Sequence, residues 1–164
     1  MNRAYILFGV PYSIYLILLY ANMINFTFSL KNNVNNQKEN RNNTLKKFTY
    51  SMMGINAITP LLLFFILKIS IYDDYTSNRG VLMLMMLFFI CLFIVNAIHS
   101  RYAMLDYGEK ILEVYQSKPI PLSYNFGRKT SIVNAWISTF LCVFSLFITV
   151  YFLSFKNANE SRDD

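Results

Sequence analysis

The stretch VLMLMMLFFICLFIV, residues 81–95, decides the fold class, because Cys91 is the only residue in it with any polar character. A helix needs roughly 20 mainly apolar residues to cross the roughly 30 Å hydrocarbon core of a bilayer. Extended to residues 80–98, this stretch approaches that length without a charged side chain. It therefore predicts a transmembrane helix.

Outward from this stretch, three further segments have the length and composition of spans: residues 5–27, 50–71 and 132–155. The last carries no charge, whereas the first two are interrupted by prolines, asparagines and, in one case, Lys68. The pattern predicts an all-α membrane protein in which residues 1–164 form one domain, a small bundle of four transmembrane helices. Segment 5–27 also has a second interpretation as a cleaved secretory signal, but its apolar run is long for one and no small-x-small site follows.

The composition agrees with a membrane protein. Hydrophobic residues make up 55% and aromatic residues 17% of the chain, which is high for a soluble fold that needs a charged surface. The 15% of charged residues collect in short stretches between the apolar segments. This is the alternation expected of spans and loops.

The distribution of lysine and arginine predicts the orientation. Loops 28–49 and 99–131 carry ten such residues, and the opposite side carries at most five, including Lys68. Because cytoplasmic loops are enriched in Lys and Arg, both loops are predicted to be cytoplasmic and both termini to lie on the other side. The predicted location is the bacterial cytoplasmic (inner) membrane.

Several polar side chains of the spans are predicted to share one depth. Since the spans alternate in direction, all of them fall in the half of the bilayer next to the basic loops: Asn22, Asn25, Asn56, Asn96, His99 and Asn134. A side-chain amide in hydrocarbon needs a partner, and interhelical hydrogen bonds are worth about 0.6–2 kcal/mol each. Two interpretations remain open: a polar layer that sets the register of the helices, which we favour, and a ligand site open to the cytoplasm.

Lys68 is the one charged residue inside a predicted span. It lies close to the end of its segment, so its long stem can carry the ammonium group to the interface, near Asp73 and Asp74. An interfacial lysine is the favoured interpretation. An intramembrane ion or proton site is the alternative, because charges within spans are costly and often functional.

The two basic loops differ in character. Residues 31–47, KNNVNNQKENRNNTLKK, are asparagine-rich and are predicted to form a loose or disordered linker. Residues 101–116, RYAMLDYGEKILEVYQ, have helical spacing of apolar positions and predict a short extramembrane helix that extends the third span. It should end before Pro119, which restricts the residue that precedes it.

No arrangement of residues points to catalysis. His99 is the only histidine, and no spacing of His, Cys and carboxylates suggests zinc or a haem held by two histidines. Cys91 and Cys142 fall near the middle of spans, where packing is their expected role. We therefore predict a protein that is not an enzyme and has no cofactor or metal, and we expect no nucleic-acid partner.

Two functions remain as hypotheses, and the lipid bilayer is a partner in both. In the first, the chain docks its helices against another membrane protein or itself, as an immunity or exclusion protein or an accessory subunit would. The small size and the composition rich in Asn, Lys, Ile and Phe are similar to those of such bacterial proteins. In the second, the chain is a small oligomeric transporter or channel that uses the asparagines and Lys68 to line a path.

Overall fold

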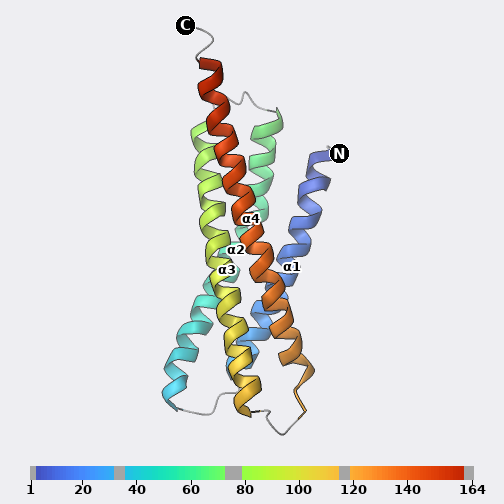
Figure 1. Cartoon of the computed structure of the whole chain (residues 1–164), viewed down its shortest axis with the longest axis vertical. Helices are drawn as coiled ribbons and strands as arrows, with labels where there is room; N and C mark the ends of the chain where they lie inside the picture. The colour runs from blue at the N-terminus through green and yellow to red at the C-terminus, as the bar shows by residue number, and fades with distance from the viewer. Residues whose placement is uncertain (1–2, 32–35, 73–78, 115–118, 161–164) are drawn as a thin grey trace.

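The computed structural model describes residues 3–31, 36–72, 79–114 and 119–160. They form four long helices, α1 (Arg3–Lys31), α2 (Asn36–Tyr72), α3 (Arg79–Val114) and α4 (Leu122–Glu160). The helices alternate in direction, so that α1 begins and α4 ends at the same end of the bundle (Figure 1). We call this the terminal end, and we call the other end, where α1 leads toward α2 and α3 toward α4, the basic end.

Every helix contains a stretch that is long and apolar enough to cross a membrane. These stretches are Phe8–Leu30, Asn42–Ile69, Gly80–Glu109 and Leu122–Val150. The predicted all-helical fold with four candidate spans is thus confirmed, and such helices indicate an integral membrane protein. The placement of each helix in a bilayer and its sidedness remain predictions.

The start of α2 corrects the expectation of a loose linker over residues 31–47. The helix begins at Asn36, and only residues 32–35 of that segment lie outside the described residues. Its early turns find partners on α1: the buried Asn42 amide donates to the Leu30 carbonyl at 3.5 Å, and Leu45 packs against the cluster around Phe26. A single leucine and one amide suffice to anchor a segment that has no apolar face of its own.

The helix expected over residues 101–116 is the final part of α3, which continues to Val114. The neighbouring residues 122–131, expected as part of a loop, are instead the first turns of α4. Pro121 precedes that helix, and its carbonyl accepts the Tyr124 N–H at 3.0 Å. Proline suits a helix start, because its fixed φ angle is already helical there.

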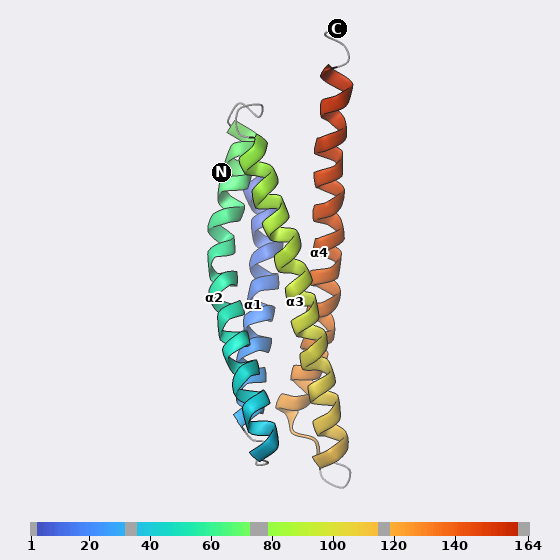
Figure 2. The same cartoon turned by 90° about the vertical axis from the view of Figure 1, so that its left-hand side faces the viewer.

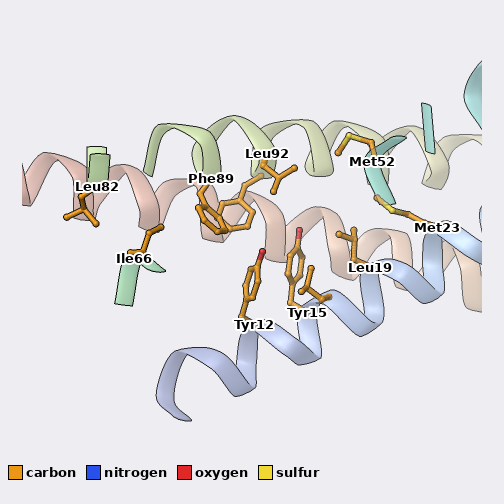
Figure 3. Packing of buried hydrophobic residues seen from close by; sticks show 11 residues of the cluster. Tyr12, Tyr15, Leu19, Met23, Met52, Ile66, Leu82, Phe89 and Leu92 are labelled. Carbon is orange, nitrogen blue, oxygen red and sulfur yellow. The ribbon is translucent and has the colours of Figure 1, made fainter. Parts of the chain in front are cut away.

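The four helices do not pack evenly. Contact is most extensive between α3 and α4, while α1 packs against both α2 and α4. Toward the terminal end α4 stands apart from the other three helices (Figure 2). The apolar core lies between α1 and α3, where Tyr12 and Tyr15 point toward Phe89 (Figure 3). The Tyr12 and Phe89 rings meet edge to face at 6.2 Å, a geometry that aromatic pairs prefer.

Candidate functional site

A hydrogen-bonded network near the middle of the bundle joins all four helices. Asn56 of α2 and Asn96 of α3 each donate to the side-chain oxygen of the other at 3.0 Å. Asn96 also donates to the Tyr15 hydroxyl of α1 at 3.3 Å, and that hydroxyl lies 2.9 Å from the Ser138 hydroxyl of α4. We call these four residues the clamp. All four are buried, so each bond is made away from solvent.

A second set of bonds, between α1 and α4, lies nearer the basic end. The Asn22 side-chain oxygen accepts from Ser131 at 3.0 Å, and from Thr130 at 3.2 Å. The Asn134 amide donates to the Leu18 carbonyl at 3.2 Å, and the Asn25 amide to the Ser123 carbonyl at 2.9 Å. We call Asn22, Asn25 and Asn134 the α1–α4 amide set. Together they fix the register of the two helices along about two turns of α1, from Leu18 to Asn25.

His99 is the last of the six predicted residues, and it too makes interhelical contacts. Its Nε2 lies 2.9 Å from the Thr49 hydroxyl of α2, and its ring meets Phe26 of α1 edge to face at 5.6 Å. Within the described residues, Nδ1 of His99 has no hydrogen-bond partner and is buried. The histidine therefore joins α1, α2 and α3 about one turn from the clamp, on the side of the basic end.

The structure places all six predicted residues between helices but does not gather them into one pocket. Asn56, Asn96 and His99 face the α2–α3 side, whereas the amide set serves α1 and α4. A ligand-binding role for the six stays a prediction. Lys68 lies apart from them, exposed on α2 toward the terminal end, and Asp73 and Asp74 lie outside the described residues.

Sequence reasoning missed the partners of these amides. Some of these partners are hydroxyl groups and others are backbone carbonyls. The signal that could have found the hydroxyl groups of α4 is a line of small residues on one helix face: Gly127, Ser131, Asn134, Ser138 and Ser145. Small side chains at such spacing let membrane helices approach closely. Tyr15 carried no such signal, since tyrosines are frequent throughout its helix.

Gly127 is the point of closest approach. A Cβ atom there would collide with the ring of Tyr107 and lie 2.7 Å from Nδ2 of Asn25. Tyr107 is fully buried and its ring packs edge to face on Phe26 at 5.8 Å, so it cannot easily move aside. Glycine is thus required where α1, α3 and α4 meet at the basic end.

The terminal half of the bundle contains an apolar crevice of about 690 Å³. All four helices line it, with Phe8 and Tyr12 of α1, Leu63 of α2, Phe89 of α3, and Phe140 and Phe144 of α4 among the lining residues. Tyr15 of the clamp also lines it, so the clamp lies at its inner end. The volume is in the range of pockets that hold small molecules.

The groups that form the clamp and the α1–α4 amide set are amides and hydroxyls, which are uncharged hydrogen-bond donors and acceptors. Within the described ranges, no group of three or more His, Cys, Asp and Glu residues is placed to hold a metal ion. Comparison of the chain with protein family models, with curated proteins and with solved structures gives no match. Functional inference therefore rests on the contacts described above.

Proposed function

We propose that this chain is an integral membrane interaction protein that docks another membrane protein through the outer face of α4, without catalysis. The single observation that carries the proposal is the shape of α4. Its small and polar residues, from Gly127 to Ser145, face the bundle, whereas Trp136 and Phe147 face away from it. A helix with such an exposed aromatic face resembles one half of a helix–helix interface.

The outer face of α4 forms a regular stripe. Trp136, Phe140 and Phe147 are 71%, 67% and 74% exposed, and Val143 and Val150 lie between and beyond them. The spacing alternates between four and three residues, the pattern of a coiled-coil seam that packs knobs into holes on a partner helix. Phe140 also stacks on Phe144 at 6.2 Å, which extends the aromatic surface.

The chain itself covers little of this part of α4. Among residues 139–150, Ser145 is the only one that is buried. The exposed stripe of α1, by contrast, is made mostly of isoleucine and valine, such as Val10, Ile14 and Ile17. Aliphatic side chains suit contact with lipid tails, whereas tryptophan and other aromatic residues carry much of the energy of protein interfaces.

The finer form of the proposal is an immunity or exclusion protein, or an accessory subunit, in a bacterial inner membrane with both basic loops in the cytoplasm. The composition, the small size and the excess of Lys and Arg at the basic end support it. The partner is another membrane protein or a second copy of this chain.

Site-specific photocrosslinking in cells that express the chain at native level tests this function. A photoreactive phenylalanine analogue at Trp136 or Phe147 should give one adduct of defined mass, and the same analogue at Ile17 should not. The double variant Trp136→Ala/Phe147→Ala should lose co-purification of the partner in mild detergent, while Ile14→Ala/Ile17→Ala keeps it. Equal crosslinking from α1 and α4, or recovery of a lone species, would contradict the proposal.

A transporter or channel is the second candidate, and one observation favours it. The buried polar atoms that have no hydrogen-bond partner within the described residues include Nδ2 of Asn22, Nδ1 of His99, Oγ of Ser100 and Oδ1 of Asn134. Such groups could interact with a polar solute. One observation speaks against a transporter or channel: the Asn56 and Asn96 amides bond to each other and close the middle of the bundle. Flux into liposomes that is unchanged by the protein, or unaffected by Asn56→Leu and Asn134→Leu, would remove this candidate.

A further inference from the structure

The apolar crevice has the length of one bilayer leaflet. It is lined by residues between 8 and 18 of α1, 82 and 93 of α3, and 137 and 148 of α4. At about 1.5 Å per residue these segments are about 15–17 Å long, close to half of the roughly 30 Å hydrocarbon core. The clamp closes the inner end at Tyr15, so the crevice extends from mid-span toward the terminal end.

The lining of the crevice indicates the class of its occupant. Extended hydrocarbon chains suit a crevice of about 690 Å³ with apolar walls, because their carbon atoms pack at about 4 Å from those of the walls. The lining is suited to such chains, with phenylalanine, leucine and isoleucine on all sides.

On α2, a lysine directly follows the residues that line the terminal end of the crevice. Ile66 and Leu67 line it, and the next residue, Lys68, is exposed, one turn before α2 ends at Tyr72. A lysine in this position can extend its ammonium group to the membrane interface. The phosphate of a lipid whose chains fill the crevice would meet opposite charge there.

We propose that the crevice binds one phospholipid from the leaflet at the terminal end, with its acyl chains between α1 and α4 and its phosphate at Lys68. The lipid would cover apolar wall that the chain leaves open and would support α4 where it stands apart (Figure 2). This site requires membrane insertion but not the docking role of α4: Phe140 belongs to both surfaces, but Trp136, Phe147 and Val150 of the stripe do not line the crevice.

Native mass spectrometry of the full chain, extracted with its membrane lipids in mild detergent, tests the site. The wild-type chain should retain one phospholipid. Leu63→Trp and Leu141→Trp, which fill the crevice, should reduce the retained fraction about tenfold or more. Lys68→Gln should reduce it about fivefold, the effect of one basic residue near the membrane surface. Leu61→Trp, an exposed position on α2 outside the crevice, is the matched control and should retain the lipid.

A second measurement does not depend on the variants. Wild-type protein in liposomes that contain a phospholipid with a photoreactive group near the end of its acyl chain should be labelled at Met86 and Phe89, which line the crevice. Labelling only of outward residues such as Leu84 and Leu87 would overturn the proposal. The proposal would also be overturned if the wild-type chain retained no phospholipid, or if the Leu63→Trp and Leu141→Trp chains were folded by circular dichroism and retained the phospholipid fully. An adduct with the mass of a second chain or of a peptide, in place of the phospholipid, would overturn it as well.

Discussion

The two ends of the bundle are held together by different forces. At the basic end α1 and α4 are joined by neutral hydrogen bonds from Asn22, Asn25 and Asn134, and Gly127 allows close approach. At the terminal end the same two helices line an apolar crevice. Lipid tails are as apolar as leucine, so apolar contacts alone give membrane helices little reason to prefer each other over lipid. The comparison shows that directional polar bonds set the assembly, and that the apolar half is left open to other molecules.

Gly127→Ala should give the largest effect, because the added Cβ meets the buried Tyr107 ring at the tightest point of the basic end. We expect a loss of about 3 kcal/mol in the free energy of unfolding, measured by titration with a denaturing detergent. Gly54→Ala is the matched control. No atom lies within 4 Å of its added Cβ, and alanine is the better helix former, so this variant should be as stable as the wild type or more stable. If the two variants were equally stable, the claim that the helices pack most tightly at Gly127 would be contradicted.

Asn96→Leu should have the second-largest effect on stability, because it leaves both Asn56 and Tyr15 without their shared partner in the clamp. The expected loss is about 2 kcal/mol in the same titration, the cost of buried polar groups left unpaired. The Asn56→Leu/Asn96→Leu double variant should lose less than the two single variants combined. Strict additivity would show that the amides act independently and that the clamp is not one unit.

Asn22→Leu should have a smaller effect of about 1 kcal/mol, because it removes two bonds between a single pair of helices. Its specific consequence is local. Disulfide crosslinking between cysteines introduced on α1 and α4 near the basic end should become slower, while crosslinking across α2 and α3 is unchanged. A uniform slowing of both would indicate general loosening and not a role for the amide set in register.

Leu141→Ala should have the smallest effect, below about 0.5 kcal/mol, since it enlarges a crevice whose apolar walls can also contact lipid. The titration used for Gly127→Ala provides the comparison. A loss as large as that of Asn96→Leu would show that the terminal end depends on tight side-chain packing, as a soluble core does.

The main error in the fold predicted from the sequence concerns the start of α2. Composition over residues 31–47 predicted a linker, but α2 already begins at Asn36, because Asn42 and Leu45 find partners on α1. Those partners are distant in the sequence and leave no local pattern. The same limit applies to the candidate site. Residue order predicts that the asparagines lie toward the basic loops, but it does not predict which groups they bond to.

The sequence by itself determined that four helices are long and apolar enough to cross a membrane. This property follows from local sums of hydropathy and from helical rise, which depend only on residue order. The tertiary structure alone decided that Asn96 bonds to Asn56 and Tyr15, that Gly127 faces Tyr107, and that a crevice opens beside α4. The reason is physical: pairing between helices depends on the rotation of each about its axis and on which neighbours it meets, and hydropathy specifies neither.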